Sequence, residues 1–195
     1  MTRNRLEAFS DGVIAIIITI MVLELRPPHG GELADLGPLL PKFLSYVLSF
    51  VFLAIYWNNH HHLLQAARHV DGRILWANVH LLFWLSLVPV TTHWLGEFHR
   101  DSVPVAAYGA VMLFAAIAYF ILQKAIVDFH GPDSLLRAAL GRDGKARVSL
   151  ASYVLAVPAA FLLPWVSIAL YVFVATIWLI PDRRIESRVH SGSGA

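Results

Sequence analysis

The chain of 195 residues contains no cysteine, which excludes disulfide bonds, thiolate metal sites and cysteine nucleophiles. Charge is also scarce: Asp, Glu, Lys and Arg make up 14% of the residues, against roughly 25% in an ordinary globular protein. The formal net charge of +2 is too small to indicate binding to nucleic acid. No GxSxG, HExxH or Walker loop is present. We therefore expect neither enzymatic activity nor a resident cofactor or metal.

Apolar residues dominate, at 57% of the chain, with a mean hydropathy of +0.62. A soluble domain of this size could not cover so much apolar surface, whereas a lipid bilayer removes the need to do so. The apolar residues gather in six spans, which predicts an all-α integral membrane protein with six transmembrane helices. The spans cover residues 6–25, 43–64, 74–95, 103–127, 148–162 and 164–180.

The later spans are less regular than the first. Pro89 predicts a kink in the third span. A helix needs about 20 residues to cross a hydrocarbon core of about 30 Å, and the last two spans are shorter than this. They form either two short transmembrane helices around a turn near Pro164 or a single re-entrant hairpin. Residues 1–182 are expected to form one transmembrane domain, and residues 183–195 a short disordered cytoplasmic tail.

Basic residues predict the orientation, because Lys and Arg are enriched in cytoplasmic segments. With six spans, twelve of the 15 basic residues fall on the side that holds both termini. We therefore expect both termini to be cytoplasmic, in a multi-pass protein of the plasma membrane. The twelve are Arg3, Arg5, Arg68, Arg73, Lys124, Arg137, Arg142, Lys145, Arg147, Arg183, Arg184 and Arg188.

The first span carries an unusual polar pair, Ser10-Asp11, ahead of its apolar run. A carboxylate inside a membrane span costs at least about 2.5 kcal/mol on insertion scales, so Asp11 should face protein or water rather than lipid. Asp11 could line an ion path, or it could make a structural ion pair or cap-like hydrogen bond. From the residue alone, both interpretations stay open.

One face of the same span carries Ile16, Thr19, Ile20 and Leu23, which follow an i, i+3, i+4, i+7 pattern. Rings of Ile and Leu from several copies would form a hydrophobic constriction, and a ring of Thr19 hydroxyls would offer oxygen ligands to a cation. The alternative is ordinary packing of an aliphatic face, with Thr19 bonded to the carbonyl four residues earlier. Spacing alone favours ordinary packing.

Three adjacent histidines, His60 to His62, follow Trp57 in the second span. Adjacent helical residues point about 100° apart, so these side chains cannot all converge on one metal ion. We expect one or two of them to bond buried polar groups instead. Polar residues of the third span lie at a similar depth, which predicts a shared interhelical network. Its candidate members are Ser10, Asp11, His60, His61, Asn78 and His80.

The motifs of the first three spans form a recognisable set. Arg5-x3-Phe9-Ser10-Asp11 is followed by Gly12-Val13-x-Ala15-Ile16-x2-Thr19 and by Val22-Leu23-Glu24. The second span has Trp57-x2-His60-His61-x-Leu63-Leu64, and the third has Asn78 and Leu87-x-Pro89-x-Thr91. This set closely resembles the signature of the transmembrane protein 175 family. His61-His62 and Val88 depart from the typical pattern.

The resemblance implies a potassium-permeable channel of a kind found in animal endosomes and lysosomes and in prokaryotic membranes, without the Thr-Val-Gly-Tyr-Gly filter of ordinary potassium channels. It implies a homotetramer whose first helices line a central pore. By the motif, Ile16, Ile20 and Leu23 match the constriction, and Thr19 matches a threonine tied to selectivity. Arg5, Phe9, Ser10 and Asp11 would belong to the polar network that holds the first helix.

The sequence leaves three hypotheses about the function of the protein. The leading hypothesis is a potassium-preferring passive cation channel, with the lipid bilayer and permeant monovalent cations as its partners. The alternative is a proton-coupled secondary transporter that uses Asp11 and the membrane histidines as a relay. A third possibility is a membrane scaffold or enzyme subunit that transports nothing.

Overall fold

The computed structural model describes residues 2–28, 30–65, 67, 69–130 and 144–179. The tail expected at 183–195 lies outside these residues. Every regular element within them is a helix, which confirms the all-α prediction. The elements are α1 (Arg3–Leu23), η1 (Leu33–Leu39), α2 (Leu40–Gln65), α3 (Gly72–Ser86), α4 (Val88–Glu97), α5 (Ser102–His130), α7 (Gly144–Ala159) and α8 (Pro164–Leu179).

Four segments of the described chain are long and apolar enough to cross a membrane: Arg3–Leu23, Leu33–Gln65, Gly72–Glu97 and Ser102–Phe129. The last two expected spans are also helical, as α7 and α8. Each has 16 residues and so measures about 24 Å, less than the roughly 30 Å of a hydrocarbon core. These two helices form a hairpin in which Ser167 Oγ donates a hydrogen bond of 2.6 Å to the Ala156 carbonyl oxygen.

The third expected span is divided into α3 and α4 at Leu87. Pro89 explains the break, because proline has no N–H to donate and its ring clashes with the carbonyl of the preceding turn. The predicted kink therefore takes the form of two short helices, with Pro89 in the first turn of α4. At the other end, Asp71 caps α3 by accepting a hydrogen bond of 2.9 Å from the Ile74 backbone N–H. This hydrogen bond holds the pKa of Asp71 below its usual value.

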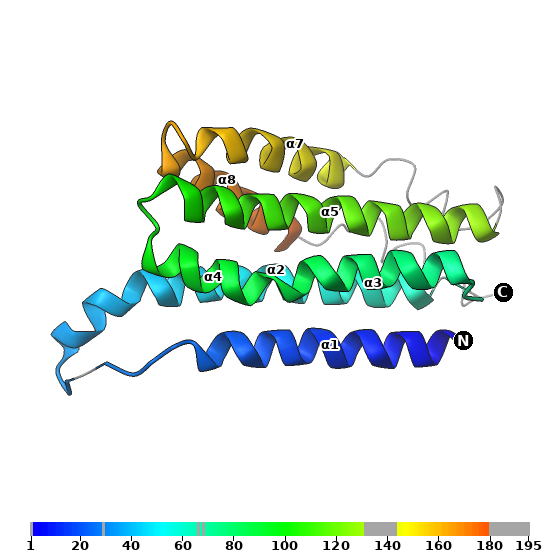
Figure 1. Cartoon of the computed structure of the whole chain (residues 1–195), viewed down its shortest axis with the longest axis horizontal. Coiled ribbons are helices and arrows are strands. Elements are labelled where there is room, and N and C mark those ends of the chain that lie inside the picture. Colours follow the sequence, from blue (N-terminus) through cyan, green and yellow to red (C-terminus); the bar gives the residue numbers. More distant parts are fainter. Residues whose placement is uncertain (1, 29, 66, 68, 131–143, 180–195) are drawn as a thin grey trace, which may run out of the picture.

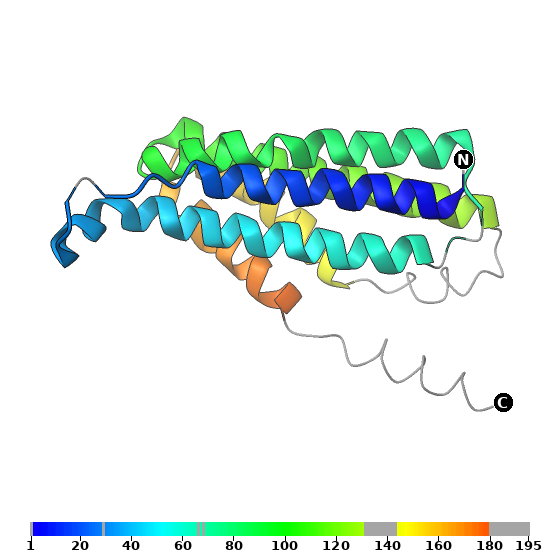
Figure 2. The ribbon, with the colours of Figure 1, turned by 90° about the horizontal axis from the view of Figure 1, so that it is seen from below.

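Helix α1 forms one edge of the bundle, and the α7/α8 hairpin lies on the opposite side (Figure 1). Helix α1 packs on α2, α3 and α4. Helix α5 packs on α3, α4, α7 and α8. Figure 2 shows α1 between α2 and the α3–α4 pair. In this arrangement α1 touches the bundle along one side only.

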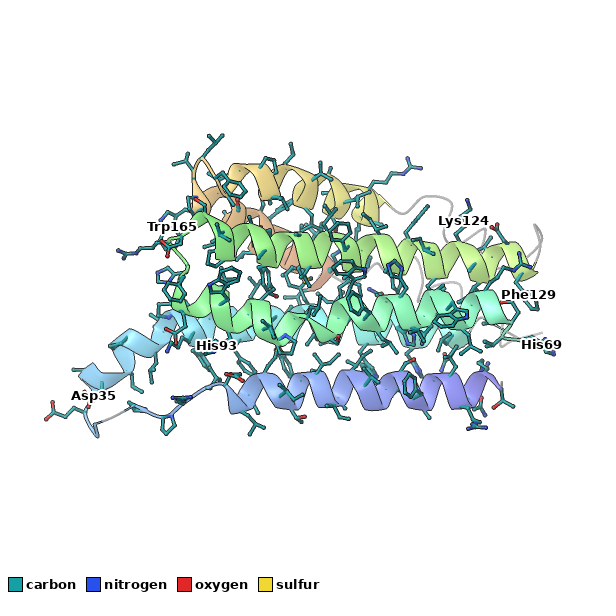
Figure 3. All side chains as sticks on the ribbon, viewed as in Figure 1. Asp35, His69, His93, Lys124, Phe129 and Trp165 are labelled. Atoms are coloured by element: carbon teal, nitrogen blue, oxygen red, sulfur yellow. The ribbon has the colours of Figure 1, made fainter. Side chains whose placement is uncertain are left out.

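The labelled side chains in Figure 3 locate the two ends of the bundle. Asp35, His93 and Trp165 mark one end, and His69 and Phe129 mark the other. We call them the Glu24 end and the Arg3 end, after the residues near the two termini of α1. At the Arg3 end, Arg3 Nη1 donates a hydrogen bond of 3.2 Å to the Gln65 carbonyl oxygen and joins α1 to α2.

Candidate functional site

Helix α1 has two faces of different character. Its buried residues recur every three or four positions, as expected for one side of a helix packed on a core. They are Leu6, Ser10, Ile14, Ile17 and Met21. Only 28% of its apolar window is buried, however, against 50% for α5. Most of the apolar surface of α1 therefore has no cover within the subunit.

The exposed face contains the predicted constriction and selectivity residues. Its members form one stripe along the helix: Phe9, Gly12, Ile16, Thr19, Ile20 and Leu23. Ile16 is 59% exposed and Leu23 is 78% exposed. The stripe is thus not part of the subunit core, and it is free to face lipid, water or another copy.

The Thr19 hydroxyl donates a hydrogen bond of 2.9 Å to the Ile16 carbonyl oxygen, three residues earlier rather than the four we considered. A hydroxyl has one proton and two acceptor lone pairs. Because the proton is used within the helix, the oxygen presents its lone pairs to the exterior. That is the polarity that a cation requires of a ligand.

On the opposite face, Ser10 anchors α1 to two other helices. Asn78 Nδ2 donates a hydrogen bond of 2.9 Å to Ser10 Oγ, which itself donates to the Leu6 carbonyl oxygen at 2.8 Å. The His60 Nε2–H donates to Asn78 Oδ1 at 2.7 Å, since an amide oxygen can only accept. All three side chains are buried. This chain from α1 through α3 to α2 is called the brace below.

Asp11 lies beside the brace, and its partner is a tryptophan. Trp57 Nε1 donates a hydrogen bond of 3.0 Å to Asp11 Oδ1, and the Trp57 ring stacks on His61 with ring centroids 6.1 Å apart. His61 Nδ1 lies 2.8 Å from a carboxylate oxygen of Glu7, and Gln65 Nε2 donates to His61 Nε2 at 2.8 Å. These contacts form a second layer between α1 and α2, more exposed than the brace.

The structure brings only part of the predicted network together. Ser10, His60 and Asn78 are in direct contact, with Asp11 and His61 in the adjoining layer. His80 instead accepts a hydrogen bond of 2.9 Å from Trp84 on its own helix. Arg5 and Phe9 are exposed on α1.

A further polar group was missed by the sequence analysis. Thr92 of α4 donates to Ser49 of α2 at 2.7 Å, and the Ser49 and Tyr108 hydroxyls lie 3.0 Å apart. Thr92 Oγ1 also lies 3.9 Å from Met21 Sδ, on the buried face of α1. Ser49 and Thr92 are small polar residues inside apolar spans, and this pattern could have indicated a polar contact between α2 and α4. Glu7 and Trp57 were missed because neither residue type is unusual near a membrane interface.

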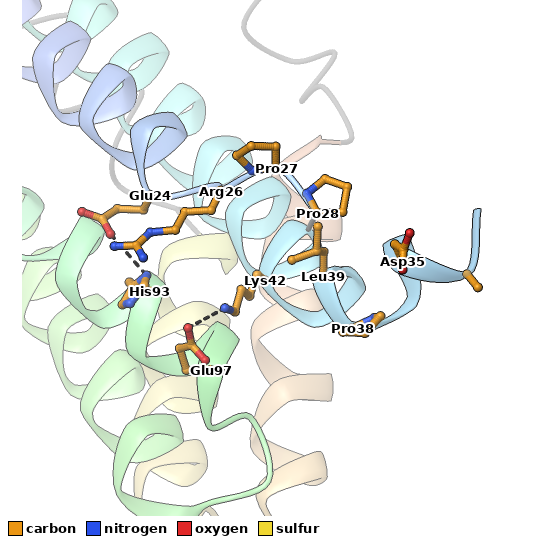
Figure 4. A pocket seen from close by; sticks show the side chains of 11 residues that line it. Glu24, Arg26, Pro27, Pro28, Asp35, Pro38, Leu39, Lys42, His93 and Glu97 are labelled. Atoms are coloured by element: carbon orange, nitrogen blue, oxygen red, sulfur yellow. Dashed lines mark ion pairs between the residues drawn. The ribbon is translucent and has the colours of Figure 1, made fainter. Parts of the chain in front are cut away.

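Two ion pairs and a hollow lie at the Glu24 end (Figure 4). Lys42 Nζ is 2.5 Å from a carboxylate oxygen of Glu97, and His93 Nδ1 is 3.4 Å from one of Glu24. The hollow has a volume of about 450 Å³ and lies between these pairs and the α1–α2 connection. Among the described residues, no group of three or more His, Asp or Glu side chains could hold a metal ion.

The fold and the two-faced α1 define a multi-pass α-helical membrane protein. The family described as endosomal/lysosomal potassium channel TMEM175 matches residues 5–89, which include α1 from Arg5 onward and all of the brace. A potassium channel of Chryseobacterium sp. (strain P1-3) is 54% identical over 186 residues, covering 95% of this chain and 97% of that protein. The chain therefore belongs to the TMEM175 family.

Two further relatives bear on the fold and the function. A crystal structure described as a lysosomal potassium-selective channel TMEM175 homolog from Chamaesiphon minutus superimposes with a TM-score of 0.79. It is 29% identical, and the match covers 91% of this chain and 96% of that one. The mouse endosomal/lysosomal proton channel TMEM175 is 28% identical over 138 residues, which cover 63% of this chain and 28% of the mouse protein.

Proposed function

We propose that the chain is a potassium-preferring passive cation channel in which the α1 helices of four copies line a central pore. The observation that carries the proposal is the exposed stripe of Ile16, Thr19 and Leu23, which lies on the helix face opposite the buried Ser10. Relatives from Chryseobacterium and Streptomyces collinus that are named potassium channels support the choice of ion.

The chemistry of the stripe suits selection by dehydration. Rings of isoleucine and leucine offer no oxygen, so an ion that passes them must give up part of its hydration shell. Potassium holds its water less tightly than sodium and loses less free energy there. The Thr19 oxygens then supply acceptors next to the Ile16 layer, and the helix itself keeps their protons turned away.

The brace would set the position of this stripe. A hydrogen bond in a low-dielectric interior is stronger than in water, and an unpaired partner there is costly. Ser10, Asn78 and His60 therefore favour one rotation of α1 against α2 and α3. Ile16 lies less than two turns along the helix from Ser10, so a rotation at the brace would turn the Ile16 ring away from the axis.

The bias in basic residues supports an orientation with both termini in the cytoplasm, in the plasma membrane of a prokaryotic cell. The Arg3 end would then face the cytoplasm, and the Glu24 end would face the exterior. Four copies around one axis would bury the α1 stripes toward the permeation path rather than toward lipid.

A flux assay on the purified full-length protein tests this proposal. Liposomes loaded with potassium should release it down its gradient, with a slower release when sodium replaces potassium. Single-channel steps in planar bilayers should accompany the flux. No flux from protein that is folded and tetrameric by native mass spectrometry would leave the non-transporting hypothesis standing instead.

The transporter alternative makes a different prediction. Residues 12–23 of α1 include no titratable side chain, so a proton relay could not follow the stripe. Potassium flux should therefore persist without a proton gradient. Saturable flux that stops when the proton gradient is collapsed would establish coupling. Because the mouse relative is named a proton channel, proton flux should be recorded in the same vesicles.

A further inference from the structure

The segment before α2 extends well beyond the rest of the bundle. We call η1 together with Leu40 the arm. In Figures 1 and 2 the arm projects past the ends of α1, α4 and α5 at the Glu24 end. Within the described chain, α2 is the element on which η1 packs most extensively. The arm is therefore an outlying part of the subunit.

The packing of α4 on α2 shows where the bundle ends. Lys42 pairs with Glu97, the last residue of α4, and a Cβ added to Gly96 would lie only 2.9 Å from Lys42 Cα. Lys42 is therefore level with the end of α4. The seven residues of η1 measure about 14 Å along their own axis, which leads away from the bundle (Figures 1 and 2). The headgroup layer on one side of a bilayer is only about 5–8 Å thick.

The arm is apolar and preformed. Leu33 is 87% exposed, Leu36 50% and Leu40 54%. A capping box between Glu32 and Asp35 fixes its start, where the Glu32 N–H donates to Asp35 Oδ2 at 3.0 Å. An ordered segment that presents leucines outside the membrane exposes apolar surface to water unless something covers it.

The direction of the arm points to the covering surface. In Figure 1 the arm descends from the line of α2 to the level of α1, whereas in Figure 2 it lies on the α2 side of α1. Exposed apolar residues also continue from the arm down α2 through Leu44 and Val47. The uncovered apolar surface of the arm thus continues along α2, which packs beside α1 and its uncovered stripe.

We infer that the arm docks on the Glu24 end of a second copy of this chain, so that four arms form a collar around the outer mouth of the pore. The contact is apolar and made by Leu33, Leu36 and Leu40. The inference rests on the proposed tetramer. The docking of the arm goes beyond that tetramer, because part of the contact between copies is then made by a segment outside the membrane. A pore lined by α1 does not require such a contact.

Site-specific photocrosslinking tests this contact. Leu36 is replaced by the photoreactive residue p-benzoylphenylalanine in the full-length protein, which is reconstituted in phosphatidylcholine liposomes and irradiated. We expect covalent dimers on a denaturing gel, with the adduct mapped by mass spectrometry to the neighbouring chain. Leu33 is a second position, because its nearly full exposure leaves room for the larger side chain.

Leu162, in the turn between α7 and α8, is the matched control. It is 83% exposed at the same end of the bundle but on the side away from α1, so we expect lipid adducts and no dimers there. Lipid adducts alone, or no adduct, at both Leu33 and Leu36 would overturn the inference. Such a result would leave the channel proposal intact if the same vesicles still conduct potassium and the protein is still tetrameric.

Discussion

At the scale of single residues, the account depends on where each polar atom directs its proton. Thr19 donates inward to Ile16 and so presents an oxygen outward. Asn78 uses both ends of its amide, donating to Ser10 and accepting from His60. Under the proposed function, Thr19 would offer its oxygen to a cation, and Asn78 joins α1 to α2 through α3.

Thr19→Val keeps the shape of the side chain and removes the oxygen. If the ring of four Thr19 hydroxyls contributes in total about 0.5–1.5 kcal/mol to potassium preference, the potassium/sodium permeability ratio should fall about two- to tenfold. Bi-ionic reversal potentials in planar bilayers measure this ratio. Thr176→Val is the control, since Thr176 makes the same kind of bond to its own helix, to the Val172 carbonyl oxygen at 2.8 Å on α8. An equal effect of both substitutions would argue against a role for Thr19 in selectivity.

Asn78→Leu removes the centre of the brace. It leaves the buried His60 Nε2–H without its acceptor, so the free energy of unfolding should drop by about 1–3 kcal/mol. Unfolding in mixed detergent micelles, followed by circular dichroism, gives the value. Ser86→Ala on the same helix removes an exposed hydroxyl bonded to Phe83 and should change stability by less than about 0.5 kcal/mol.

At the scale of helices, the ends and crossings of α3 and α4 position the brace. Asp71 fixes where α3 starts, seven residues before Asn78. Gly96 allows the last turn of α4 to lie against the backbone of α2. Both features act on elements that contact α1.

The Asp71 cap should make stability depend on pH. Its pKa is lowered in the folded protein by the Ile74 N–H, so its contribution is present above the ordinary Asp pKa of about 3.9 and is lost as the pH falls through the lowered value. Thermal unfolding at pH 7 and at acidic pH measures this loss. Asp71→Asn retains a capping oxygen that does not titrate, so that variant should lose less stability on acidification. Identical acid sensitivity in both proteins would contradict the assignment.

Gly96→Ala should separate α4 from α2. The new methyl group would press on the Lys42 backbone, which cannot move as a flexible side chain can, and overpacking of this kind costs about 1–3 kcal/mol. Gly72→Ala at the start of α3 is the control, because no heavy atom lies within 4 Å of its new Cβ. The same detergent titration should show a lower midpoint for the first variant only.

At the scale of the whole molecule, sequence patterns predicted where the helices lie in the chain more accurately than they predicted which side chains meet between helices. Apolar runs located all six helical segments, and Pro89 located the division between α3 and α4. Ser10, Asn78 and His60 were grouped by depth alone. Depth does not fix rotation about a helix axis, however, so it could not show that Asp11 meets Trp57 or that His80 turns to Trp84. The arm was not predicted, because the second expected span begins only at residue 43, whereas helical structure begins at Leu33.

In the described subunit, α1 and the segment Leu33–Gln65 leave most of their apolar windows uncovered, whereas half of the window is buried in the other two long spans. Only 28% of the apolar window of α1 is buried. We propose that four copies cover this surface by sharing the α1 stripe around an ion path. It follows that Ile16, rather than exposed α1 residues in general, should control which ion passes.

Ile16→Ala and Val22→Ala test that claim most directly. Both replace an exposed aliphatic residue of α1, but Val22 lies about 120° around the helix from Ile16. The measurement is the bi-ionic potassium/sodium reversal potential of each reconstituted channel. We predict that Ile16→Ala moves the potential toward zero and raises conductance, while Val22→Ala behaves as the unsubstituted protein. An unchanged potential for Ile16→Ala, or equal shifts for both variants, would contradict the account.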